Sequence, residues 1–106
     1  MLDSALETKA QFLHGFSHKT RIQILETLRT GEKTVSEIME TVAGSQSSIS
    51  QHLACLRRCG IVVGRQEGKF MYYRLRNEKI QDLLAAFDLV LTDMEDEIQA
   101  CQHSID

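Results

Sequence analysis

The chain has 106 residues with a formal net charge of −3, and 42% of its residues are hydrophobic. This length suits one domain with a modest core, and the balance of apolar and charged residues excludes wholesale disorder. No apolar run approaches the roughly 20 residues that a membrane-spanning helix needs. We therefore expect a single domain over residues 1–106, with no signal peptide, no membrane partner and a cytoplasmic location.

The charges are unevenly distributed along the chain. Residues 45–76 hold six basic side chains and one acidic one, whereas residues 77–106 hold one basic side chain and eight acidic ones. A local basic segment matters more to a polyanionic partner than the total charge does. The odd number of cysteines, in a chain without a secretion signal, argues against a disulfide framework.

The first 44 residues predict three helices. Residues 3–14 begin with a capping-box pattern, and Ser17 can cap a second helix over residues 18–30. Thr34 and Glu37 form another capping box, which begins a third helix that ends at Gly44.

Residues 45–60 predict the central helix, which begins at the N-cap Ser45 and ends at Gly60. Its apolar positions fall on one stripe: Ile49, Leu53 and Leu56. The opposite side is polar, and Cys55 and Cys59 stack one turn apart on the flank between the two. A glycine-containing turn joins this helix to the one before it, the pattern of a helix-turn-helix.

The period then changes to that of strands. Residues 61–66 and 69–75 are β-branched and aromatic runs around Glu67-Gly68, which predicts a two-stranded hairpin. The fold class is thus mainly α with a β-hairpin wing: a winged helix-turn-helix of order αααα-ββ-α.

Asn77 caps a final predicted helix over residues 78–101. Its apolar residues follow a heptad seam: Ile80, Leu84, Phe87, Leu91, Met94, Ile98 and Cys101. Because this helix is longer than the domain core requires, we expect a homodimer through the first and last helices, 3–14 and 78–101. The alternative is that the helix covers only its own core.

A helix N-terminus and short polar side chains can meet phosphate and base edges. We therefore predict these DNA-binding residues: Ser45, Gln46, Ser47, Ser48, Ser50, Gln51 and Arg58 on the central helix, with Arg65, Gln66 and Lys69 on the hairpin. The alternative is a solvated polar face. No glycine-rich phosphate loop, paired catalytic acids or nucleophile–base arrangement indicates an enzyme or a small-molecule substrate.

The cysteines are candidate metal ligands, with small buried apolar residues as the alternative. Thiolates of Cys55, Cys59 and Cys101 would suit large soft ions such as Cd(II), Pb(II) or As(III), and His103 is a possible fourth ligand. An i,i+4 pair on an intact helix is badly placed for a mutual disulfide.

Taken together, the segments SHKTRIQILETL, GSQSSISQHLACLRRCGIV and EGKFMYYRL resemble the ArsR/SmtB family of winged helix-turn-helix repressors. The resemblance implies a homodimer on a two-fold symmetric operator, an inverted repeat, that is released by an inducer. The family's cysteine site before the recognition helix is absent, since Thr34-Val35-Ser36-Glu37 stands there. Its zinc site on the last helix is also absent.

The run Cys55-Leu56-Arg57-Arg58-Cys59-Gly60, followed by Cys101, is similar to the CmtR type of cadmium/lead sensor within this family. That similarity implies Cd(II) or Pb(II) as the inducer, bound by Cys55, Cys59 and Cys101, with the third thiolate from the partner subunit. As(III) and Zn(II) are further candidate ions. Two alternatives stay open: a thiol-redox or As(III)-responsive repressor of the same fold, and a protein-interaction dimer that does not bind DNA.

Overall fold

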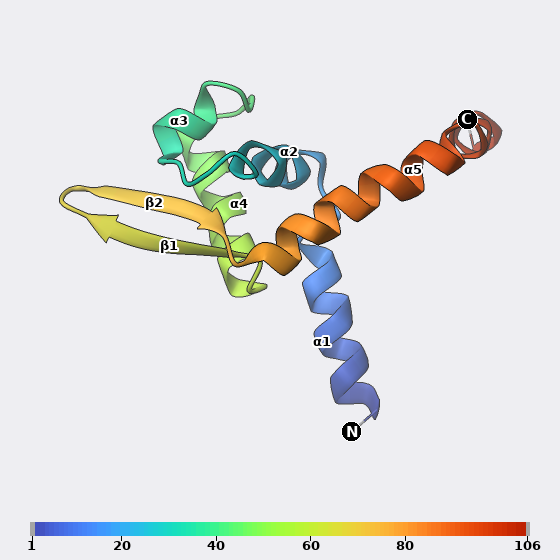
Figure 1. The fold of residues 1–106 in the computed structure, drawn as a ribbon, viewed down its shortest axis with the longest axis horizontal. Helices are drawn as coiled ribbons and strands as arrows, with labels where there is room; N and C mark the ends of the chain where they lie inside the picture. Colours follow the sequence, from blue (N-terminus) through green and yellow to red (C-terminus); the bar gives the residue numbers. More distant parts are fainter. Residues whose placement is uncertain (1, 106) are drawn as a thin grey trace.

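The computed structural model describes the backbone of residues 2–105 and all of their side chains except those of residues 2–3, 96 and 98–105. The elements follow the predicted order, four helices, a hairpin and a long helix (Figure 1). Their bounds are α1 Leu2–His14, α2 Lys19–Leu28, α3 Val35–Met39, α4 Gln46–Arg58, β1 Val62–Glu67, β2 Phe70–Leu75 and α5 Glu78–Ile105. No helix in the described part of the chain is both long and apolar enough to cross a membrane.

The helix starts of α3, α4 and α5 follow the capping chemistry of the sequence, and two others do not. The capping box predicted at the start of α1 is wrong, because the helix already begins at Leu2 and Ser4 lies inside it. The hydroxyl of Thr34 accepts from the Glu37 amide, and the Glu37 carboxylate accepts from the Thr34 amide, so the predicted capping box of α3 is present. The prediction that Ser17 caps α2 is wrong. His18 is the cap, because its Nδ1 accepts from the Thr20 amide, whereas the Ser17 hydroxyl donates to the His14 carbonyl at the end of α1.

The hairpin turn lies one residue further along than predicted. Glu67 pairs with Phe70, so Gly68 and Lys69 form a two-residue turn and Glu67 still belongs to β1. Gly68 has φ +61°, the left-handed conformation that such a turn needs at its first central position. A short third segment also joins the sheet, because the backbone of Lys33 exchanges two hydrogen bonds with that of Tyr73.

The core lies where α2, α3, α4, the base of the hairpin and the start of α5 meet. Its buried apolar side chains each contribute about 1.5–3 kcal/mol of transfer free energy. They are Ile24, Leu25, Leu28, Ile38, Val42, Ile49, Leu53, Leu56, Ile61, Val62, Leu75, Ile80 and Leu84. The predicted stripe of α4 is thus fully buried, which fixes the helix with its polar side outward.

Two helices project from this core. Figure 1 shows α1 and most of α5 leaving the body in different directions, with the hairpin projecting on the opposite side. The Cα radius of gyration is 15.5 Å, against about 13 Å for a compact chain of this length. Most of the exposed large apolar side chains lie on the projecting helices: Leu6, Leu13, Leu89, Val90, Leu91 and Met94.

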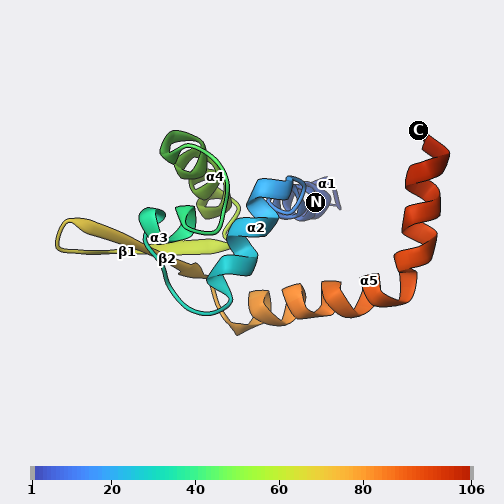
Figure 2. The same cartoon turned by 90° about the horizontal axis from the view of Figure 1, so that it is seen from above.

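The last helix runs beyond its predicted end. Asn77 is its cap, since its side-chain carbonyl accepts from the amides of Lys79 and Ile80. The helix continues past Cys101 to Ile105, because neither glycine nor proline interrupts it. Figure 2 shows that α5 bends sharply along its length, so its two halves run in different directions.

Candidate DNA-binding surface and thiol pair

The N-terminal end of α4 presents polar groups to solvent. The hydroxyl of Ser45 accepts from the Ser48 amide and caps the helix. Five of the six predicted contact residues at this end are exposed: Ser45, Gln46, Ser47, Ser50 and Gln51. The sixth, Ser48, is half-buried against the cap. Free backbone N–H groups and the positive end of the helix dipole lie among these side chains, an arrangement suited to phosphate.

Basic side chains occupy the other end of the same helix. Arg57 and Arg58 are both exposed, and they stand in its last turn. The helix of 13 residues spans roughly 20 Å at 1.5 Å per residue. Arg58 is therefore about three turns away from Ser45, so the predicted α4 contacts form an extended strip with a polar end and a basic end.

The three predicted contact residues of the hairpin differ in their surroundings. Arg65 lies in an ion-pair network, with its Nε 3.0 Å from one Glu32 carboxylate oxygen and its Nη1 2.9 Å from Glu67. Its guanidinium also stacks over the Tyr72 ring at 4.9 Å. Gln66 donates to the Gly68 carbonyl, and Lys69 is exposed at the turn.

The network has electrostatic consequences for both partners. The hydrogen bonds from Arg65, followed by its charge, hold the pKa of the Glu32 carboxyl below its ordinary value. The carboxylates of Glu32 and Glu67 raise the pKa of Arg65 in turn. The positive charge of Arg65 is thus already paired with two carboxylates of the same chain, and the side chain would have to leave them to contact a phosphate.

The two thiols stand one turn apart at the C-terminal end of α4, where Cys59 is the C-cap residue and lines a pocket together with residues of α1. Cys55 and Cys59 are free and half-buried. Burial, and next the neighbouring Cys55, raise the pKa of the Cys59 thiol, while the charges of Arg21 and Arg58 oppose that rise. Cys101 lies in the last turns of α5, and its side chain is outside the described residues, as is that of His103.

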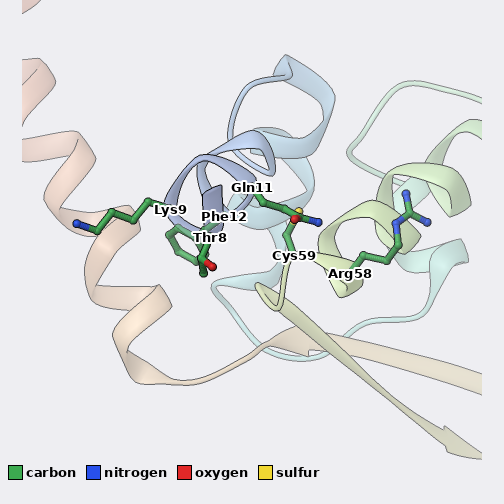
Figure 3. A pocket seen from close by; sticks show the side chains of 6 residues that line it. All are labelled: Thr8, Lys9, Gln11, Phe12, Arg58 and Cys59. Atoms are coloured by element: carbon green, nitrogen blue, oxygen red, sulfur yellow. The ribbon is translucent and has the colours of Figure 1, made fainter. Parts of the chain in front are cut away.

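A pocket of about 430 Å³ opens beside Cys59, between α1 and the end of α4. Its walls are Thr8, Lys9, Gln11, Phe12, Arg58 and Cys59 (Figure 3). In this view Gln11 reaches toward Cys59, whereas Arg58 and Lys9 extend away from the thiol on opposite sides. The thiol is therefore reachable from the surface where α1 passes the C-terminal end of α4.

The described side chains of one chain hold no group of three metal-ligating residues. Cys55 and Cys59 supply two sulfur donors of the kind that soft ions prefer. A metal site on these thiols therefore needs at least one further donor, from Cys101 or from a second chain.

One polar cluster was not singled out by the sequence. Arg21, buried within the apolar side of α2, donates to the carbonyls of His14 and Gly15 at 2.9 and 3.3 Å. Its Nη1 lies 3.4 Å from Nδ1 of His52 on α4, whose ring stacks 4.5 Å from that of His18. Burial, then the charges of His18 and Arg21, lower the pKa of His52. His52 is thus half-buried, with its ring held between Arg21 and His18.

Two helices joined by a short turn, the second with an exposed polar face, and a hairpin beside them define a winged helix-turn-helix, the architecture of DNA-binding transcription regulators. The sequence model of the family described as "Bacterial regulatory protein, arsR family" matches residues 18–63. A protein of Streptomyces lividans called "Probable mercury resistance operon repressor" is 30% identical over 95 residues, 90% of this chain and 76% of that protein. The chain belongs to the ArsR family of transcription regulators.

Solved structures agree with this assignment. The crystal structure of Rv0081 from Mycobacterium tuberculosis matches 88% of this chain and 94% of that chain, with a TM-score of 0.82 and 34% identity. A solution structure from Mycobacterium bovis, described as a homodimeric winged helix-turn-helix DNA-binding domain, matches 90% of this chain and 87% of that one, with a TM-score of 0.80 and 29% identity. These relatives are regulators, which agrees with the prediction that the chain is not an enzyme.

Proposed function

We propose that this chain is an operator-binding repressor that works as a symmetric homodimer and leaves DNA when a thiophilic metal ion binds Cys55 and Cys59. The observation that carries the proposal is the position of the thiols on α4, the recognition helix of this fold: Cys55 lies in its last turns and Cys59 is its C-cap residue. A ligand held there acts on the element that would read the operator. Such a regulator works where the chromosome is, which for a bacterial protein is the cytoplasm.

Dimerisation accounts for the apolar surface that a single chain leaves uncovered. Leu89 is 73% exposed and Val90 is 54% exposed on α5, while Leu6 is 61% exposed on α1. An apolar hollow of about 570 Å³ also lies between α2 and α5, lined by Phe16, Ile22, Glu26, Leu84, Phe87, Asp88, Val90 and Leu91. Exposed apolar surface of this extent on a soluble protein is typical of an interface, and the M. bovis relative is described as homodimeric.

A two-fold dimer would present two copies of α4 and of the hairpin. Each α4 would place Ser45, Gln46, Ser47, Ser48, Ser50 and Gln51 in a major groove, with Arg58 on the flanking backbone. Symmetry then favours an operator with two inverted half-sites, about one helical turn apart or a multiple of it. On the hairpin, Lys69 and Gln66 would reach the neighbouring backbone directly, whereas Arg65 would first have to leave Glu32.

The proposed metal site needs a third ligand atom besides the two thiolates of α4. Cys55 and Cys59 would hold the ion through two thiolates, and we assign the third to Cys101, of the same chain or of the partner. Soft ions such as Cd(II), Pb(II) and As(III) accept three sulfur ligands, and Zn(II) accepts thiolates with a fourth donor. The relative described as a mercury resistance operon repressor supports a soft metal as the class of inducer.

The switch can be tested on the whole protein. A cognate duplex is first selected from a random library with the metal-free dimer, and its affinity is then measured with and without Cd(II). We expect Cd(II) to weaken wild-type binding by about 5- to 150-fold, the range of ordinary allosteric coupling, and to leave Cys55→Ser unaffected. Ala54→Ser is the matched control, because it adds a hydroxyl beside Cys55 and leaves both thiols in place. An unchanged wild-type affinity in Cd(II) would end the metal hypothesis.

Two further outcomes separate the alternatives. A thiol-redox repressor would show oxygen or disulfide mass shifts at Cys55 or Cys59 under peroxide, without stoichiometric metal uptake. A protein-interaction dimer would select no duplex and would show no salt-dependent DNA binding.

A further inference from the structure

We infer that Phe70, at the tip of the hairpin, is a DNA-contacting residue that places its ring in the minor groove. This inference rests on the proposed DNA-binding function, and adds a residue outside the polar and basic set predicted from the sequence. Phe70 is 51% exposed. The other exposed apolar side chains, apart from Met39, lie on α1 and α5 and are accounted for by dimerisation.

The hairpin carries this ring away from any packing partner in its own body. Phe70 is the first residue of β2, directly after the two-residue turn, and Figure 1 shows the turn at the far end of the projecting hairpin. Strand pairing places Phe70 opposite Glu67, and Tyr72 opposite Arg65. Side chains of directly paired residues share a face, so one face of the hairpin alternates aromatic and charged groups.

The other face of the hairpin explains why Phe70 is exposed. Tyr73 packs against the core and Leu75 is buried. Because residues alternate along a strand, Phe70 and Tyr72 point to the side opposite Tyr73 and Leu75. Phe70 and Leu75 lie on opposite faces of β2, so a register that buried Phe70 would expose Leu75. The exposure of Phe70 therefore follows from the fold.

The charged groups around the Phe70 ring indicate which kind of partner it would contact. The Lys69 ammonium lies 5.7 Å from the centroid of the Phe70 ring, while the nearby Glu67 carboxylate is paired with Arg65 at 2.9 Å. An exposed aromatic ring beside a free ammonium group suits a polyanion that also offers flat apolar surface, which is nucleic acid. The hairpin follows α4 in the chain and packs against it through β1, and we therefore take the same duplex as the occupant. Lys69 would meet the phosphates, and Phe70 the sugars and base edges of the adjacent minor groove.

The test uses the full-length protein and the duplex that the wild type selects. Phe70→Ala should weaken binding by about tenfold or more, the order expected for one lost aromatic contact, while Phe70→Leu, which keeps an apolar wedge, should retain most of the affinity. Hydroxyl-radical footprinting reports minor-groove sugars. We expect wild type and Phe70→Leu to protect sugars flanking each half-site, and Phe70→Ala to lose that protection while α4 contacts persist.

Replacing G·C by I·C pairs at those flanking positions adds a groove-specific measurement, since it removes the minor-groove amino group and leaves the major groove unchanged. The base substitution should alter the affinity of the wild type for the duplex and leave the affinity of the Phe70→Ala variant unchanged. Equal affinity and equal footprints for wild type and Phe70→Ala would overturn the inference, and so would weaker binding with an unchanged footprint. If the wild type selects no duplex at all, the proposed function fails instead, so the two failures are distinguishable.

Discussion

Arg21 ties the end of α1 to both α2 and the recognition helix, α4. A guanidinium has five N–H donors in a fixed fork, and here they reach the His14 and Gly15 carbonyls, the Ser17 hydroxyl and the His52 ring. A side chain only 8% exposed can carry this charge only because its donors are satisfied.

Replacing Arg21 by methionine keeps much of the volume but removes the donor to the Gly15 carbonyl, while the His14 carbonyl keeps its bonds from Ser17. We expect a loss of about 2–4 kcal/mol in the free energy of unfolding, measured by urea denaturation. Arg29→Met is the control, since its ion pairs with Glu26 and Asp88 lie at the surface, where water and salt screen them, and its effect should be much smaller. Equal effects of the two substitutions would show that the Arg21 cluster does not hold the helices together.

Glu32 gives the fold a pH dependence with a definite sign. The pKa of its carboxyl is lowered in the folded protein, first by hydrogen bonds from Arg65. The stabilisation is therefore fully present above the unfolded value, about 4.3, and is lost as the pH falls through the lower folded value. Glu32→Gln should reduce stability at pH 6, and the difference from wild type in denaturation curves should shrink progressively as the pH falls below the unfolded value. A difference that persists at low pH would contradict the ion pair.

At the scale of elements, α3 is short enough to depend on its cap. It has only five residues, so the reciprocal hydrogen bonds of Thr34 and Glu37 satisfy a large share of its backbone ends. We expect Thr34→Ala to cost about 1 kcal/mol in urea denaturation. Ser36→Ala, an exposed position in the first turn of the same helix, is the control and should be nearly neutral. A neutral Thr34→Ala would mean that the helix is held by Ile38 alone.

The elements also show what the sequence could and could not predict. Local chemistry was sufficient for the α4 stripe, the Thr34 capping box and the positive φ of Gly68, because each depends on residues within one or two turns, although the hairpin turn itself lies one residue later than predicted. The pairing of Lys33 with Tyr73 and the contact of Arg21 with His52 join segments far apart in the chain, and no local pattern marks them. Ser17 failed as a cap because its hydroxyl serves α1 instead.

The candidate site divides in the same way. The exposed polar face of α4 and the placing of Cys55 and Cys59 on its flank followed from helical periodicity. The engagement of Arg65 by Glu32 could not be foreseen, since 33 positions separate them. Phe70 was read only as a strand residue, because its exposure depends on which hairpin face meets the core. The role of Cys101 stays a prediction.

For the whole molecule, the projecting helices make assembly part of the structure. Val90 is exposed on α5 and lines the apolar hollow against α2. If that surface is the dimer interface, Val90→Glu buries a charge in each protomer, and the cost doubles because the interface is two-fold. We expect a concentration-dependent shift to monomer in sedimentation velocity and a loss of duplex binding.

Met39→Glu is the matched control for this change, because Met39 is also an exposed apolar residue but lies on α3. It should leave the sedimentation coefficient unchanged. If Val90→Glu left the dimer as intact as Met39→Glu does, the dimer interface would have to lie on another surface.

The coupling between thiols and DNA is tested most directly by one titration. Cd(II) is added to the reduced dimer on its selected duplex, and near-ultraviolet thiolate-to-metal absorption and the fluorescence anisotropy of the labelled DNA are recorded in the same sample. We predict that the two signals change together and saturate at the same stoichiometry, and that Cys101→Ser weakens both. Absorption that saturates while the anisotropy stays constant would contradict the account, because metal would then bind without releasing the operator.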